Sequence, residues 1–149
     1  MLTFSIFETS NKIIVVARDS EKLRSIKKQF SKIETFQCDL TKQQDLDELI
    51  LCVEQNYPNC NMLINNAGVQ YNYNFITDHD IINKIDYEIN TNLTATIKLC
   101  ALLLPTLSKN NNTTTVNVGN GLAILPKKSA PVYCAIKVAI HNFTKALRY

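Results

Sequence analysis

The chain has 149 residues, of which 46% are hydrophobic and 19% charged, a composition typical of a folded domain and not of a disordered segment. A formal net charge of +3 is too small to favour nucleic-acid binding. The five cysteines have no regular spacing, which favours reduced thiols in a cytoplasmic protein over a disulfide framework or a zinc site. The longest apolar run, 99–104, is far shorter than the roughly 20 residues that span a bilayer, so we expect no membrane helix.

Strand and helix patterns alternate along the chain. Short runs that are apolar on both faces predict buried parallel strands, and amphipathic repeats between them predict helices. Ser20 is a candidate N-cap for the first helix, and Pro131 suits the first turn of the last one. In chain order, we expect a strand at 12–17, a helix at 20–30, a strand at 33–38, a helix at 41–56, a strand at 61–65, a loop at 66–73, weak helical signals at 78–85, a strong helix at 87–108, a strand at 113–118 and a helix at 132–149.

This alternation predicts an α/β domain with a doubly wound parallel sheet and right-handed crossovers. A nucleotide-binding sheet of this kind opens with a strand, a glycine-rich turn and a helix that receives a diphosphate at its N-terminus. The chain has only three glycines, and none lies near the strand expected at 12–17. Residues 2–7 fit either a short strand or the tail of a helix. We therefore expect a single partial, Rossmann-like domain that lacks the first strand–helix unit and the C-terminal strands.

Three motifs stand at characteristic places along these elements. Residues 65–68 (NNAG) directly follow a predicted strand, Asn92 lies on the long helix, and residues 133–137 (YCAIK) open the last helix. With these motifs in this order and spacing, the chain resembles the short-chain dehydrogenase/reductase family over roughly residues 11–149. The resemblance implies an oxidoreductase that uses NADP to convert a small carbonyl or alcohol substrate. It also implies a homodimer formed through the helices at 87–108 and 131–149.

Tyr133 and Lys137 are four residues apart, so both project from one helix face. A cation beside a phenol stabilises the phenolate, which makes Tyr133 a candidate general acid and base. The alternative is that Tyr133 is an ordinary residue of a packed amphipathic helix. The resemblance implies that Tyr133 transfers the proton, that Lys137 also holds the cofactor ribose, and that Asn92 keeps a water in the proton relay. Asn120 stands where the family has serine, and its amide is a candidate donor to the substrate carbonyl.

Candidate cofactor-binding residues lie at the ends of the predicted strands. Arg18 follows the first strand, where a cation favours the 2′-phosphate of NADP over the free ribose of NAD; the alternative is a solvated arginine at a helix start. Asp39 matches an adenine-contacting aspartate of the family, and it is equally a candidate N-cap of the next helix. The resemblance places Asn66, Ala67 and Gly68 beside the adenine ribose, where Gly68 permits close backbone approach.

Three functions are compatible with the sequence: a working NADP-dependent reductase, a truncated and inactive remnant of one, and a non-catalytic module that pairs with a full-length relative through its two long helices. The remnant is favoured by the absence of a glycine-rich turn, of a serine at position 120 and of a segment after residue 149 that would close over the nicotinamide. We therefore expect millimolar affinity for the cofactor, about 4 kcal/mol of binding free energy, and little or no carbonyl reduction.

Overall fold

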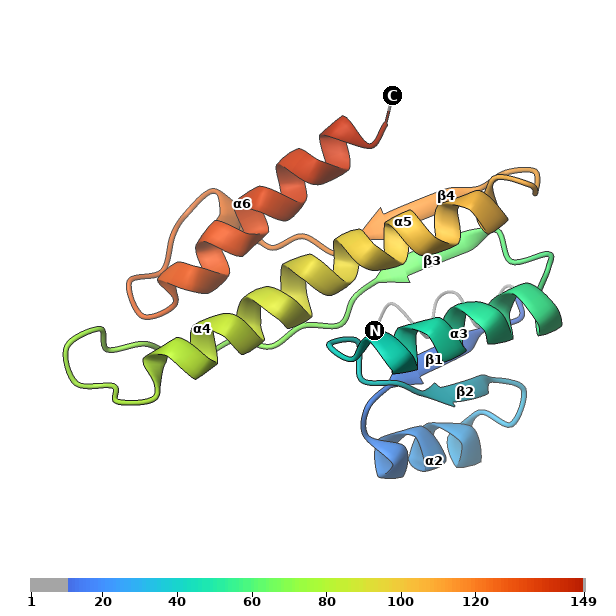
Figure 1. The fold of residues 1–149 in the computed structure, drawn as a ribbon, viewed down its shortest axis with the longest axis horizontal. Coiled ribbons are helices and arrows are strands. Elements are labelled where there is room, and N and C mark those ends of the chain that lie inside the picture. The colour runs from blue at the N-terminus through green and yellow to red at the C-terminus, as the bar shows by residue number, and fades with distance from the viewer. Residues whose placement is uncertain (1–10, 149) are drawn as a thin grey trace. The chain divides into compact units, whose positions relative to one another are not determined.

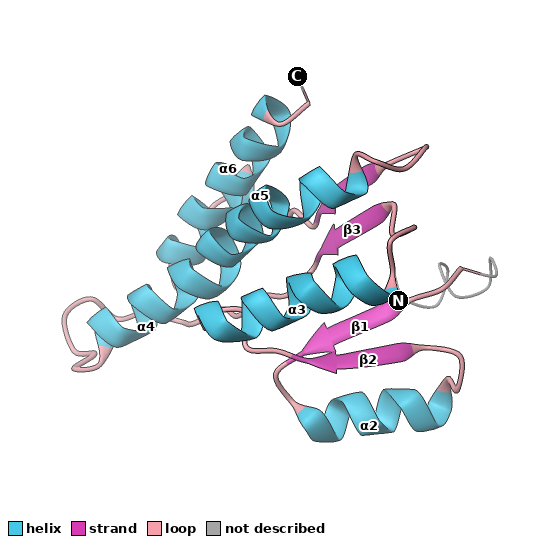
Figure 2. Ribbon diagram, turned by 45° about the vertical axis from the view of Figure 1, so that its right-hand side comes forward, coloured by secondary structure: helices cyan, strands magenta, loops and turns pink. Residues whose placement is uncertain are grey.

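The computed structural model describes residues 11–148, and the chain divides into two compact units, Met1–Leu49 and Ile50–Tyr149. The sequence-based interpretation of residues 2–7 lies outside the described part. The described strands form two separate parallel pairs, β1 with β2 in the first unit and β3 with β4 in the second. Figures 1 and 2 show the elements of each unit. The predicted α/β class and the parallel pairing are therefore confirmed, with a sheet that is split among the described residues.

In the first unit, β1 (Ile14–Ala17) lies in register with β2 (Glu34–Gln37). Helix α2 (Ser20–Gln29) connects these strands, packs against both and buries Leu23. The prediction of Ser20 as its N-cap is wrong. The side chain of Asp19, one residue earlier, accepts hydrogen bonds from the backbone N–H groups of Glu21 and Lys22, both at 3.0 Å. Asp19 therefore caps the helix, as a carboxylate at this position is well suited to do.

Helix α3 (Gln43–Asn56) follows the first strand pair and leads into the second unit, where β3 (Met62–Asn65) pairs in parallel with β4 (Thr114–Asn117). The helix was expected to start at residue 41, but residues 39–42 form a turn and the helix begins at Gln43. All four strands are shorter than predicted: β1 and β3 start later than expected, and β2 and β4 lose one residue at each end.

A long continuous helical rod crosses the second unit (Figure 1). It consists of α4 (Ile81–Ile89), a π-helical turn η1 (Asn90–Thr94) and α5 (Ala95–Leu107). The strand β4 is followed by a short 3₁₀ turn, η2 (Gly121–Ala123), and by α6 (Pro131–Ala146), which begins at the proline as expected. No helix in residues 11–148 is long and apolar enough to cross a membrane.

The core of the second unit lies between its helices and its strand pair. Helix α5 packs against β3, and α6 packs against β4, α4 and η1. These contacts bury mainly small and branched apolar side chains, as periodic apolar positions on a helix predict. The buried apolar residues of α5 and α6 are Ala95, Leu99, Cys100, Leu103, Leu107, Cys134, Ile136 and Ile140.

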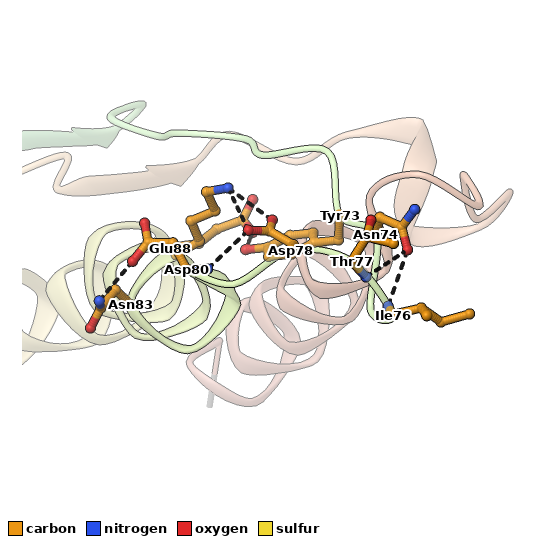
Figure 3. Close-up of polar contacts among 9 residues, drawn as sticks. Tyr73, Asn74, Ile76, Thr77, Asp78, Asp80, Asn83 and Glu88 are labelled. Atoms are coloured by element: carbon orange, nitrogen blue, oxygen red, sulfur yellow. Dashed lines mark hydrogen bonds and ion pairs between the residues drawn. The ribbon is translucent and has the colours of Figure 1, made fainter.

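The segment before α4 is held by side-chain hydrogen bonds within the segment and from α4 (Figure 3). The side chain of Asn74 accepts hydrogen bonds from the N–H groups of Ile76 and Thr77, at 3.1 and 3.3 Å. Lys84 donates to both carboxylate oxygens of Asp78, at 2.9 and 2.8 Å. Such local side-chain contacts compete with helix formation. They explain why the helix begins at residue 81 and not at 78, where the sequence pattern first suggests it.

Candidate functional site

Helix α6 brings Tyr133 and Lys137 together. The Nζ atom of Lys137 lies 5.3 Å from the centroid of the Tyr133 ring, within the range of a cation–π contact. The same Nζ donates a hydrogen bond of 2.8 Å to the carbonyl oxygen of Val118, just after β4. Lys137 is 8% exposed, and burial lowers the pKa of its ammonium. A cation is therefore held beside the tyrosine in a poorly solvated position, where its field acts strongly.

The π-helical turn carries Asn92, which is 3% exposed. Its side-chain amide pairs with both backbone groups of Val69: Oδ1 accepts from the N–H at 2.8 Å, and Nδ2 donates to the carbonyl at 2.6 Å. This double contact fixes the loop that follows β3. Because α6 packs against η1, Asn92 lies on a helix adjacent to the one that carries Tyr133.

The loop residues Asn66, Ala67 and Gly68 are exposed. A Cβ atom on Gly68 would lie 3.3 Å from Oδ1 of Asn92, closer than most real Cβ contacts. The backbone of Gly68 does not have a positive φ. The close approach of the loop to Asn92, and not an unusual backbone conformation, therefore favours glycine at this position.

Asn120 lies in the exposed segment between β4 and α6. Its side-chain oxygen accepts a hydrogen bond of 2.9 Å from the N–H of Leu122, so that it caps the 3₁₀ turn η2. The carbonyl that receives Lys137 belongs to Val118, two residues earlier. An amide side chain also carries an NH₂ donor, and this donor is the group that a substrate carbonyl would require.

Asp39 follows β2 in the first unit. Its carboxylate accepts hydrogen bonds from the N–H and the hydroxyl of Thr41, at 3.0 and 2.7 Å, while its own N–H donates to Asp45 at 2.8 Å. Burial by itself would raise the pKa of Asp39, but the hydrogen bonds from Thr41 outweigh it and the pKa is lowered. The prediction that Asp39 is the N-cap of the next helix is wrong, because α3 begins at Gln43 and the carboxylate closes the preceding turn.

Arg18 is exposed and directly follows β1. Its carbonyl oxygen accepts a hydrogen bond of 3.1 Å from the side chain of Gln37, the last residue of β2. Since β1 and β2 are parallel, Arg18 and Asp39 both lie at the carboxyl edge of this strand pair. Ligands of open α/β sheets bind at this edge.

Glu88, a fully buried carboxylate on α4, was not among the site residues predicted from the sequence. Its two oxygens accept hydrogen bonds from the hydroxyl of Tyr73 at 2.5 Å and from the N–H of Tyr71 at 3.3 Å. The available signal was its position four residues before Asn92, which places both side chains on one face of the rod.

The predicted site residues thus fall into two groups, each inside one unit. The second unit holds Asn66, Ala67, Gly68, Asn92, Asn120, Tyr133 and Lys137, and the first holds Arg18 and Asp39.

Comparison with known proteins gives consistent matches. A family model described as short chain dehydrogenase matches residues 2–149. An uncharacterized oxidoreductase of Bacillus subtilis, DltE, is 35% identical over 144 residues, which cover 97% of this chain and 57% of that protein. An uncharacterized oxidoreductase of Staphylococcus aureus is 28% identical over 142 residues, which cover 94% of this chain and 61% of that protein. The chain therefore spans about three fifths of the length of these relatives.

Solved structures show the same fold. The crystal structure of serine dehydrogenase from Escherichia coli matches with a TM-score of 0.88 and 21% identity, over 99% of this chain and 67% of that one. L-sorbose reductase from Gluconobacter frateurii, in complex with NADPH and L-sorbose, matches with a TM-score of 0.79 and 23% identity, over 91% of this chain and 53% of that one.

Proposed function

Because this chain belongs to the short-chain dehydrogenase family, we propose that it carries the acid–base part of an NADP(H)-dependent oxidoreductase site for a small carbonyl or alcohol. The observation that supports this most strongly is the buried Lys137, whose ammonium lies 5.3 Å from the ring centroid of Tyr133. A buried cation beside a phenol stabilises negative charge on that phenol. This is the property that a tyrosine acid and base requires.

In the reduction direction, the Tyr133 hydroxyl would give its proton to the carbonyl oxygen of the substrate, and Lys137 would stabilise the phenolate that remains. The Asn120 amide would donate a hydrogen bond to the same oxygen in place of a serine hydroxyl. Asn92 would hold the loop at 66–73 in place through its paired contacts with Val69. A bound nicotinamide would supply or accept the hydride.

Each unit, taken by itself, holds donor groups that suit a part of NADP(H). At the carboxyl edge of β1 and β2, the exposed Arg18 can pair with a 2′-phosphate, which supports NADP over NAD. In the second unit, the Lys137 ammonium is a donor for ribose hydroxyls. The 149 residues contain no glycine-rich turn for the diphosphate. We therefore expect the chain alone to bind NADP(H) with a millimolar dissociation constant, about 4 kcal/mol, and to show little or no turnover.

The test is NADPH oxidation with a panel of aldehydes and ketones, compared among four proteins. These are the chain as given, its Asn120→Ser variant, a chimera that adds the flanking segments of the Bacillus subtilis relative, and the same chimera with Asn120→Ser. We expect measurable turnover only in the chimera, with a further increase when Asn120→Ser is added. If the unmodified chain turns over substrate, and Tyr133→Phe abolishes that turnover, the chain is instead a compact working reductase.

A second candidate function is a non-catalytic module that pairs with a full-length relative through its two long helices. Apolar side chains exposed on these helices favour it: Ile97 on α5 is 38% exposed and Val138 on α6 is 43% exposed. Co-expression with a full-length relative, followed by light scattering, tests it. Pairing would be supported if the two proteins co-purify, and if Ile97→Lys abolishes the co-purification while Lys98→Arg retains it. Purification of this chain as a monomer, without the relative, would contradict pairing.

A further inference from the structure

We propose that Glu88 and Tyr73 form a clamp that positions the loop at 66–73 against the start of α6, and that Glu88 is therefore a positioning residue for the candidate site. The catalytic meaning of the clamp rests on the proposed function. The clamp itself is a structural arrangement inside the second unit, and it can be tested without cofactor or substrate.

The clamp begins with a carboxylate that has no exposed surface. Both of its oxygens receive hydrogen bonds, one from the Tyr73 hydroxyl at 2.5 Å and one from the Tyr71 N–H at 3.3 Å. Figure 3 shows Tyr73 and Glu88 beside the turns that precede α4. Lys84, one helical turn before Glu88, is engaged by Asp78. The donors that hold Glu88 therefore come from the loop.

Glu88 and Asn92 together hold alternate residues of one loop. Asn92 binds both backbone groups of Val69, and Glu88 binds the backbone of Tyr71 and the side chain of Tyr73. The two polar side chains lie one turn apart on the same helical rod. The loop is thereby held in a single register along the rod, from Val69 to Tyr73.

Tyr73 extends the contact to the helix that carries the candidate acid and base. Its N–H donates to the carbonyl oxygen of Ser129 at 2.8 Å. The next residue, Ala130, is fully buried, and its carbonyl accepts the N–H of Cys134 at 3.1 Å in the first turn of α6. Tyr73 thus joins Glu88 on α4 to Ser129, which lies two residues before the start of α6 and four residues before Tyr133.

Burying a carboxylate costs desolvation free energy, and apolar residues of similar volume often stabilise a fold as well or better. Hydrogen bonds with defined directions provide something that apolar contacts do not, namely one fixed register between the partners. The directed hydrogen bonds of Glu88 therefore favour a positioning role for this residue over a purely stabilising one.

The test is amide hydrogen exchange by NMR on the complete 149-residue chain without cofactor. The variants are Glu88→Gln, which keeps the size and removes the charge, and Tyr73→Phe, which removes only the hydroxyl. Asp86→Asn is the matched control, an exposed acid on the same helix. We expect exchange of the Val69 and Tyr71 amides to accelerate about tenfold in Tyr73→Phe and by a smaller factor in Glu88→Gln.

The exchange of the Leu103 amide, in the core of α5, reports global unfolding and should remain within about twofold. The Tyr133 ring signal, observed with tyrosine labelled in the ring carbons, should shift in Tyr73→Phe and not in Asp86→Asn. Equal acceleration at Leu103 and in the loop would show general destabilisation and overturn the proposal, as would an unchanged loop or an unchanged Tyr133 signal. Failure of the proposed function would appear only in the NADPH assays.

Discussion

Replacing Asn92 by alanine should lower the free energy of unfolding through the loss of one well-defined contact. The Asn92 amide is 3% exposed and forms two hydrogen bonds with the backbone of Val69, at 2.8 and 2.6 Å. Alanine removes both bonds and leaves the N–H and carbonyl of Val69 without these partners. Alanine also has the highest helix propensity, so the helix itself is not weakened by the substitution.

The magnitude follows from the two bonds. A buried hydrogen bond contributes about 1 kcal/mol net, so the loss of both costs about 2 kcal/mol. Val69 is half-buried, and water can replace part of what is lost. In a domain of this size, 1 kcal/mol changes the melting temperature by about 2–4 °C, so we expect a decrease of about 4–8 °C.

The assay is thermal and urea unfolding followed by far-UV circular dichroism, with Asn83→Ala as the control. Asn83 is an exposed asparagine on α4 that makes one hydrogen bond, at 2.7 Å to Asp80. The control should cost less than about 0.5 kcal/mol, as exposed substitutions usually do. If Asn92→Ala unfolds at the same urea concentration as Asn83→Ala, the paired contact with Val69 does not stabilise the loop, and the reasoning is refuted.

Gly68→Ala should be less stable than Gly119→Ala by about 1 kcal/mol in the same assay. The alanine Cβ at position 68 would lie 3.3 Å from Asn92, whereas a Cβ at position 119 meets nothing within 4 Å. Equal stabilities of the two variants would refute the close approach. Burial raises the pKa of the Cys38 thiol to about 11, so a thiol reagent at pH 8 should label half-buried Cys52 before Cys38. The unfolded thiol ionises from about pH 8.5 and the folded one only near pH 11. Stability should therefore fall as pH rises across this window, and Cys38→Ala should remove that part of the slope; faster labelling of Cys38 or an unchanged slope would contradict this.

The sequence predicted best what local patterns determine. The strand expected at 61–65 and the NNAG loop after it are found at β3 and its following loop, because a buried apolar run and a turn are set by neighbouring residues. Pro131 marks the start of α6 for the same reason. The N-cap was misplaced by one residue, from Asp19 to Ser20, because both side chains can cap and sequence alone does not say which one precedes the first helical turn.

Features that depend on distant contacts were not predictable in the same way. The π-helical turn at Asn92 accompanies a contact with Val69, which lies 23 residues away in the sequence. The burial of Glu88 depends on Tyr73, 15 residues away, and an acidic residue on an amphipathic helix is ordinarily solvated.

We propose Tyr133, supported by Lys137, as the acid and base of a dinucleotide-dependent site. The most direct test is the rate of NADPH oxidation by the chimera with the Bacillus subtilis flanking segments, with and without Tyr133→Phe, and with Tyr57→Phe as the control. We expect Tyr133→Phe to lower the rate by about 10²-fold or more and Tyr57→Phe to leave it within about twofold. A chimera that oxidises NADPH equally well with Tyr133→Phe would contradict the claim.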